Sequence, residues 1–170
     1  MASPFFVTAI IVSHDGATWL PEVIAALSSQ TRRIDRIIAV DTGSKDSSPK
    51  LLRSAGITFI PADREIGFGD AIEIALEHAP QLSDPIDAAN ECLWLIHDDC
   101  APSKNALEKL LVALEERPNV VIAGPKLLGW HDRDHLLEVG ISIAPNGARW
   151  TGLEPREQDQ GQHDLSLIHI

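Results

Sequence analysis

Residues 92–99 read CLWLIHDD, an apolar run that passes directly into a histidine and two aspartates. The apolar part is short and shows no polar alternation, which is typical of a strand covered on both faces of a sheet. Such strands occur where helices pack on both sides of a parallel sheet. The stretch therefore predicts a layered α/β fold with charged side chains at one strand end.

The same arrangement recurs along the chain, with helical spacing of apolar residues between the runs. Strands are expected at residues 5–12 (FFVTAIIV), 36–40 (RIIAV), 57–60, 92–96 and 120–123. Helices are expected at residues 17–29, at residues 49–54, from residue 67 and from residue 102. Shorter alternating segments at residues 136–143 and 148–150 predict a β-hairpin or edge strands. Strand alternating with helix predicts an open, mostly parallel sheet flanked by helices.

Polar residues follow the expected strand ends. Ligands of open parallel sheets bind beyond the carboxyl ends of the strands. This rule selects four stretches, namely residues 13–16, 41–44, 62–69 and 97–100. We therefore expect these stretches to lie together and to form the functional site.

All four stretches contain candidate ligand contacts, beginning with the three that precede residue 97. Asp41 ends the second strand, where an acidic side chain commonly accepts hydrogen bonds from a ribose or base, although an Asx-type turn is the alternative. The turn at residues 13–16 lacks GxGxxG, so no dinucleotide grip is predicted, but its groups could face a base. Gly67 precedes a helix whose N-terminus favours phosphate, and a plain turn is the alternative.

The triplet His97-Asp98-Asp99 is the most informative stretch. Adjacent carboxylates at a strand end repel one another, and leaving them there is costly unless a cation or hydrogen-bond donors compensate. A divalent cation would compensate, and a diphosphate would complete its shell of oxygen ligands. The alternative is that the two acids cap the next helix, whose N-terminus favours anions.

The composition narrows the classes of partner. The chain has 170 residues and a formal net charge of -11, with 25 acidic and 14 basic residues, so nucleic acid is excluded as a partner. A phosphate-bearing small molecule would be repelled as well, so its binding would need a local positive charge such as a divalent cation. The apolar run at residues 5–12 lacks a basic leader, and no stretch approaches the ~20 apolar residues of a membrane span. A soluble, cytoplasmic protein is expected, while a longer parent protein could still associate with the inner face of the plasma membrane.

Four phrases of the sequence, taken together, resemble the family 2 glycosyltransferases. In chain order they are IIVSHDGATWLPEVIAALSSQT at residues 10–31, AVDTGSKDSS at 39–48, IGFGDA at 66–71 and LIHDDCAP at 95–102. The resemblance extends to about residue 150. It implies a Rossmann-like fold of the GT-A type and the inverting transfer of a sugar from a nucleotide-diphospho-sugar to an acceptor hydroxyl.

The resemblance also implies roles for individual residues. Asp15 and Asp41 would contact the nucleotide, Ser13 would shape its pocket, and Asp98 would lie near the ribose and diphosphate. Gly67 belongs to the same nucleotide-binding set, and Asp99 would hold Mg²⁺ or Mn²⁺. The chain departs from the family at two positions. His97 stands where aspartate is common in the DxD-type triplet, and Glu65 stands where asparagine is frequent.

Length is the larger departure from the family. Members continue into an acceptor-binding region that supplies the catalytic base, and nothing here matches it, so the catalytic residue is unknown. We expect a nucleotide-sugar-binding domain at residues 1–150, followed by a flexible or truncated polar tail at residues 151–170. The expected acceptor is a glycan or a lipid-linked molecule of cell-envelope polysaccharide synthesis. Pairing of two copies through an exposed apolar face is left open.

Two other functions compete with a glycosyltransferase. A nucleotidyltransferase also uses an α/β sheet and metal-binding acids, but it should show a glycine-rich, basic phosphate loop after the first strand. The stretch SHDGATW at residues 13–19 is neither. The second alternative is a catalytically inactive, GT-A-like scaffold, which the histidine at position 97 and the missing base favour.

Overall fold

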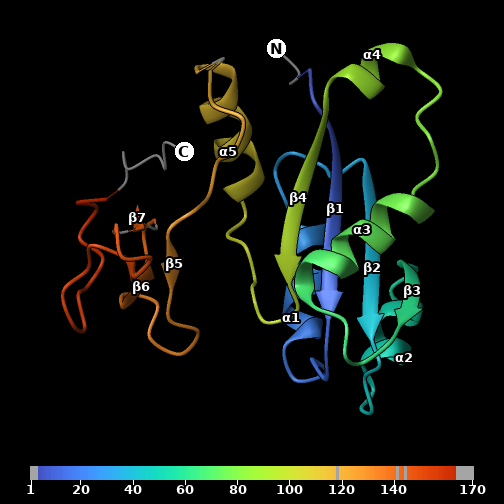
Figure 1. Cartoon of the computed structure of the whole chain (residues 1–170), viewed down its shortest axis with the longest axis horizontal. Helices are drawn as coiled ribbons and strands as arrows, with labels where there is room; N and C mark the ends of the chain where they lie inside the picture. The colour runs from blue at the N-terminus through green and yellow to red at the C-terminus, as the bar shows by residue number, and fades with distance from the viewer. Residues whose placement is uncertain (1–3, 118, 141, 144, 164–170) are drawn as a thin grey trace. The chain divides into compact units, whose positions relative to one another are not determined.

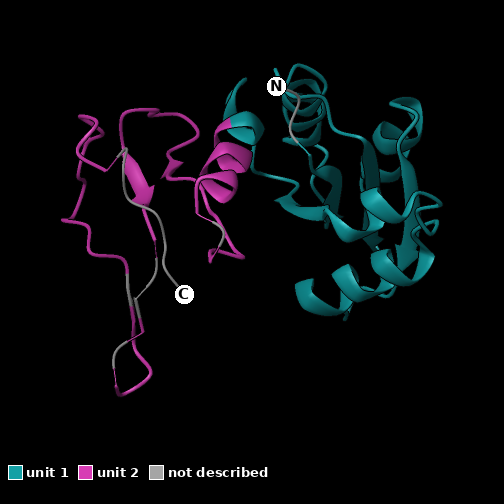
Figure 2. Ribbon diagram, turned by 90° about the horizontal axis from the view of Figure 1, so that it is seen from above, with its two compact units in different colours: residues 1–108 teal, residues 109–170 magenta. Residues whose placement is uncertain are grey.

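The computed structural model describes residues 4–117, 119–140, 142–143 and 145–163, and the chain forms two compact units. The first unit comprises residues 1–108 and the second residues 109–170 (Figure 2). They are considered separately below. The predicted domain boundary at residue 150 stays a prediction.

The first unit is built on a four-stranded parallel sheet. Its strands are β1 (Phe6–Ser13), β2 (Arg36–Thr42), β3 (Thr58–Ala62) and β4 (Glu91–His97). They lie in the order β3-β2-β1-β4, and each neighbouring pair is parallel (Figure 1). From Val7 to Ser13 every residue of β1 is buried, as expected for a central strand covered on both faces. The predicted open, parallel α/β architecture is therefore confirmed.

Helices connect the strands. Their bounds are α1 (Leu20–Ser28), α2 (Ser48–Ser54), α3 (Phe68–His78), α4 (Pro85–Ala89) and α5 (Ala106–Glu115). Helix α1 buries Leu20, Val23 and Leu27, an apolar stripe at helical spacing. Helix α4 lies in the connection between α3 and β4, and the Asp84 side chain caps it by accepting from the Ile86 N–H at 2.8 Å. Among the described residues, none of the helices has the length and apolar character of a membrane span.

Helix α3 covers one face of the sheet (Figure 1). Its Ala71 and Ala75 are fully buried against a core formed by Ile10, Val12, Ile38 and Val40. Two alanines on the buried face let the helix axis approach the sheet closely. This packing places the first residue of α3 close to the carboxyl ends of the strands.

The second unit contains short antiparallel pairs. Strand β5 (Leu127–Leu128) pairs with β6 (Leu136–Glu138), and β7 (Ser142–Ile143) pairs with β8 (Arg149–Trp150). These pairs confirm the hairpin or edge-strand character predicted for this region. Part of the predicted polar tail is tied to them, because Leu136 N–H donates to the Glu157 carbonyl at 2.9 Å. Residues 164–170, which hold the terminal LSLIHI, lie outside the described residues.

The predicted fifth strand at residues 120–123 was wrong. These residues form no strand in the described stretch 119–140, and Val121 and Ile122 are 85% and 56% exposed. A β-branched run becomes a strand only where a neighbouring strand takes up its backbone hydrogen bonds and a face of it is buried. The local sequence shows that residues 120–123 favour a strand, but it does not show whether a neighbouring strand is available to pair with them. The prediction failed for this reason.

The different environments of two valines give a test of this assignment. Val40 is fully buried in β2, whereas Val121 is 85% exposed. We expect Val40→Ala to lower the free energy of unfolding by about 2 kcal/mol, because it removes buried apolar surface. The same change at Val121 should stay within about 0.5 kcal/mol. Urea unfolding followed by circular dichroism measures both, and equal losses would mean that residues 120–123 pack as a strand after all.

Candidate functional site

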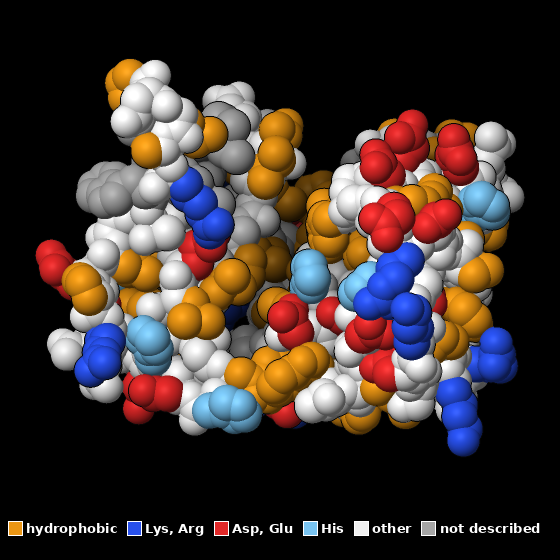
Figure 3. Space-filling model, turned by 60° about the horizontal axis from the view of Figure 1, so that its bottom comes forward, with side chains coloured by type: hydrophobic (Ala, Val, Ile, Leu, Met, Phe, Trp, Pro, Cys, Tyr) orange, Lys and Arg blue, Asp and Glu red, His pale blue; other side chains and the backbone are white. Residues whose placement is uncertain are grey.

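The four stretches selected from the sequence meet at the carboxyl edge of the sheet in the first unit. The His14 N–H donates to Asp98 Oδ2 at 2.7 Å, and His14 Nδ1 lies 2.9 Å from Thr42 Oγ1. The Arg64 guanidinium donates to the Gly43 carbonyl at 2.9 Å. Viewed from this end, the surface of the first unit shows acidic, histidine and basic side chains close to one another (Figure 3). The prediction that these stretches come together is confirmed by these contacts.

Ser13 and Asp41 form the buried floor of this edge. They are register partners at the ends of β1 and β2, and they are 0% and 4% exposed. Asp41 Oδ2 accepts from the Ser44 N–H at 3.2 Å, but Asp41 Oδ1 and Ser13 Oγ have no hydrogen-bond partner among the described residues. Leaving a buried polar atom unsatisfied costs about 1–3 kcal/mol. Two such atoms lie on neighbouring strand ends, each with less than 1 Å² of exposed surface.

Asp15 is engaged on both carboxylate oxygens. Oδ1 accepts from the Lys45 N–H at 2.6 Å, and Oδ2 pairs with Arg64 at 2.6 Å. The Arg64 hydrogen bond, followed by the one from the Lys45 backbone, lowers the pKa of Asp15 to about 2. Its backbone has a positive φ of 53°, which aspartate tolerates better than most residues. The partnership with Arg64 was not predicted from the sequence, since the two residues are separated by two strands and two helices.

Asp98 is held in a defined position at the end of β4. It is 5% exposed, and its Oδ2 takes the His14 N–H described above. A Cβ added to Gly16 would lie 2.1 Å from that same Oδ2, so only glycine leaves room for the carboxylate. This role of Gly16 was not predicted from the sequence, because the clash with Asp98 arises only from tertiary contact.

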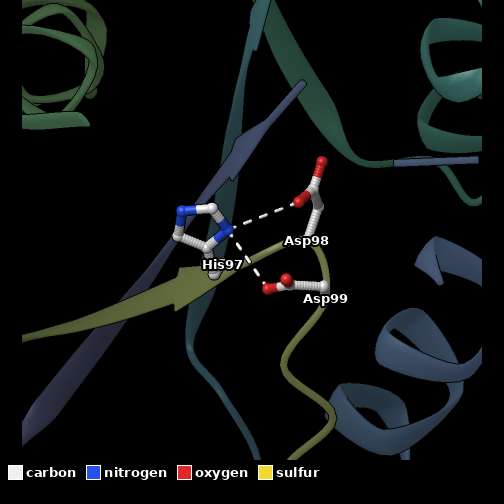
Figure 4. A group of neighbouring side chains, drawn as sticks. All are labelled: His97, Asp98 and Asp99. Carbon is white, nitrogen blue, oxygen red and sulfur yellow. Dashed lines mark ion pairs between the residues drawn. The ribbon is translucent and has the colours of Figure 1, made fainter. Parts of the chain in front are cut away.

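The triplet His97-Asp98-Asp99 brings three possible metal ligands together (Figure 4). His97 Nδ1 lies 3.4 Å from Asp98 Oδ1 and 3.2 Å from Asp99 Oδ1. One ligand atom from each residue lies within 4.8 Å of the others. The side chains of His97 and Asp99 are 55% and 60% exposed, so a ligand can reach them. Two carboxylates and an imidazole form a donor set that fits a divalent cation.

The start of α3 adjoins this triplet. The Phe68 ring stacks on the His97 ring with centroids 5.2 Å apart and an angle of 5° between the planes. Gly67 is the N-cap of α3, and a Cβ there would meet only Asp70 Oδ2, at an ordinary 3.8 Å. Glycine is therefore not required at position 67 by packing alone, and its predicted contact with a nucleotide stays a prediction. The stacked pair was not foreseen, since residues 68 and 97 are distant in sequence.

Comparison with known sequences and structures identifies a family and a fold that this chain shares. Residues 8–136 match the sequence model of glycosyl transferase family 2. A search of curated proteins gave no significant match. Among solved structures, the chain is similar to the mannosyltransferase PcManGT from Pyrobaculum calidifontis in complex with GDP-Man and Mn²⁺, with a TM-score of 0.59 and 20% identity over 73% of this chain and 36% of that chain.

Two further solved structures share the fold. TarS 1-349 from S. aureus has a TM-score of 0.50 and 14% identity over 75% of this chain and 43% of that chain. Glucosyl-3-phosphoglycerate synthase from M. tuberculosis has a TM-score of 0.50 and 17% identity over 64% and 39%. At these identities the likeness shows the GT-A fold alone, and this chain spans well under half of each of these structures. Because the family model covers 129 of the 170 residues (136 − 8 + 1), the chain belongs to glycosyl transferase family 2.

Proposed function

We propose that this chain forms the donor site of a metal-dependent, inverting glycosyltransferase. The reaction would transfer a sugar from a nucleotide-diphospho-sugar to a hydroxyl of a glycan or lipid-linked acceptor. Family membership supports nucleotide-sugar transfer in general. The observation that carries the finer proposal is the arrangement at the carboxyl edge, where two unsatisfied buried atoms and the triplet at residues 97–99 lie on adjoining strand ends.

In this proposal the floor of the site recognises the nucleoside. Asp41 Oδ1 would accept a hydrogen bond from the base or ribose, and the buried Ser13 hydroxyl would complete the pocket. Asp98 would lie near the ribose and diphosphate, because the His14 N–H and the absence of a side chain at Gly16 fix its carboxylate in advance. Such fixed geometry lowers the cost of ordering the site when the donor binds.

Asp15 and Gly67 complete the proposed nucleotide-binding set. Any contact of the Asp15 carboxylate with a nucleotide would have to share an oxygen with Arg64 or with the Lys45 N–H. Gly67 would let the backbone at the start of α3 approach a phosphate, which the positive end of the helix dipole favours.

The negative charge of the site favours the binding of a cation together with the donor. The chain has a net charge of -11, and a diphosphate beside Asp98 and Asp99 would be repelled without compensation. Asp99 is proposed to hold Mg²⁺ or Mn²⁺, with the neighbouring members of the triplet close enough to contribute. When bound, this cation would stabilise the negative charge on the departing nucleoside diphosphate. We assign the catalytic base to no described residue.

The proposal predicts metal-dependent binding of one nucleoside diphosphate. Calorimetric titration of UDP, GDP and dTDP, each with and without Mn²⁺, should show one that binds with Mn²⁺ present. Its affinity should fall at least about tenfold without Mn²⁺ or in Asp99→Ala, because the phosphates then lose their compensating charge. Glu77→Ala, an exposed position near the far end of α3, is the matched control and should bind as the parent does. An absence of binding under every condition would leave the inactive-scaffold alternative.

A second prediction concerns the base or ribose contact of Asp41. Asp41→Asn keeps the shape of the side chain but replaces one acceptor oxygen with a donor. We expect the affinity for the preferred nucleotide to fall about 10- to 100-fold, as a charged hydrogen bond is lost. Calorimetry in Mn²⁺ measures this loss, and circular dichroism checks that the variant is folded. Glu77→Gln is the control, and an unchanged affinity in Asp41→Asn would show that Asp41 merely orders its own turn.

A further inference from the structure

The orientation of His97 is fixed by contacts outside the triplet. Its ring is 55% exposed, yet it stacks flat on Phe68. His97 pairs in register with Val12, on the face of the sheet that α3 covers, and Phe68 is the first residue of α3. The stack therefore anchors an otherwise solvent-accessible ring to the helix that packs on the core.

The anchored ring directs one nitrogen at both carboxylates (Figure 4). Nδ1 lies 3.4 Å from Asp98 Oδ1 and 3.2 Å from Asp99 Oδ1. Adjacent ligands of an octahedral cation with bonds of about 2.1 Å lie roughly 3 Å apart. Asp98 Oδ2 is already taken by the His14 N–H, which leaves Oδ1 for this purpose. The distances from His97 Nδ1 to the two carboxylate oxygens are thus close to the distance between adjacent ligands of one octahedral cation.

On the basis of the proposed function, we propose that His97 is a ligand of the same cation as Asp99 and makes the site prefer Mn²⁺ to Mg²⁺. Mg²⁺ takes oxygen ligands and releases its water reluctantly. Mn²⁺ accepts carboxylate oxygen as readily, and transition ions as a class tolerate imidazole nitrogen better. Phe68 is the positioning residue, since its ring stacks on the ring of His97.

A direct test uses Mn²⁺ alone with the full chain. Electron spin echo envelope modulation of bound Mn²⁺ should show coupling to a ¹⁴N nucleus, and histidine labelled with ¹⁵N should change that signal. His97→Asp restores an all-carboxylate triplet. It should keep Mn²⁺ bound, abolish the nitrogen coupling and lower the preference for Mn²⁺ over Mg²⁺ about tenfold. His78→Gln, at the opposite end of α3, is the control and should retain the coupling.

The possible failures separate this inference from the proposed function. Mn²⁺ binding that depends on Asp99 but shows no nitrogen coupling would overturn the role of His97 and leave the proposed donor site standing. Coupling that persists in His97→Asp would also overturn it. If no Mn²⁺ binds to the parent chain, both the inference and the metal-dependent part of the proposed function are wrong. The nucleotide titrations without metal would then decide the remainder.

The role of Phe68 gives a separate prediction. Phe68→Leu keeps an apolar side chain but removes the stacked ring, so we expect Mn²⁺ affinity to fall about tenfold with a much smaller change for Mg²⁺. Phe68→Tyr keeps the ring and should restore both the affinity and the nitrogen coupling. A structural role of Phe68 alone would lower the affinities for the two ions equally. Such an equal loss, or full Mn²⁺ affinity in Phe68→Leu, would contradict the assignment.

Discussion

The parallel backbone hydrogen bonding of β1 with β2 and β4 is the constraint on which the site depends. Strand β1 has a partner on each edge and is buried on each face, so its direction fixes that of its neighbours. Three strands that run the same way must end at the same edge. The register then sets which residues meet there, pairing Val12 with both Val40 and His97 and Ser13 with Asp41. The pairing of the strand backbones thus makes neighbours of polar residues that are far apart in the sequence. Contacts between their side chains are not needed for this.

The charges at this edge are only partly balanced by the protein. Asp15 is neutralised by Arg64, and Asp46 is satisfied by the N–H groups of Ala17 and Ser48. These contacts link the loops that follow β1, β2 and β3, which makes them part of the scaffold. Asp98 and Asp99 both form an ion pair with His97, and an imidazole compensates two carboxylates only in part even when protonated. This uneven distribution leaves the carboxylates after β4 less fully compensated than Asp15 and Asp46, as the proposed cation at Asp99 requires.

How much was predictable from sequence depended on whether a feature was local. Continuous apolar runs identified all four strands of the sheet, and the expected burial on both faces holds for β1. It does not hold for β4, where Leu93 and Leu95 are 44% and 45% exposed. The run at residues 120–123 has the same composition but no paired neighbour, and no local pattern distinguishes the two cases. The strand-end rule correctly predicted that the four polar stretches lie together at one edge of the sheet, as it needs only the order of the elements. The contacts that shape the site, such as Gly16 with Asp98 and Phe68 with His97, arise from packing between elements and could not be inferred from spacing.

His97 shows why this distinction matters for function. Judged by sequence, a histidine in place of the common aspartate weakens a DxD-type triplet and favours an inactive scaffold. That prediction holds only if the side chain at position 97 contributes nothing but its charge. In the folded chain the ring has a fixed orientation, imposed by a residue of a different helix, and its nitrogen faces both neighbouring carboxylates. A substitution that removes one oxygen ligand can therefore supply a nitrogen ligand at nearly the same place. In the proposed site, the nitrogen ligand changes the relative affinities for different metal ions. A fixed donor atom of a different kind discriminates between cations that carboxylates alone would bind with similar affinity.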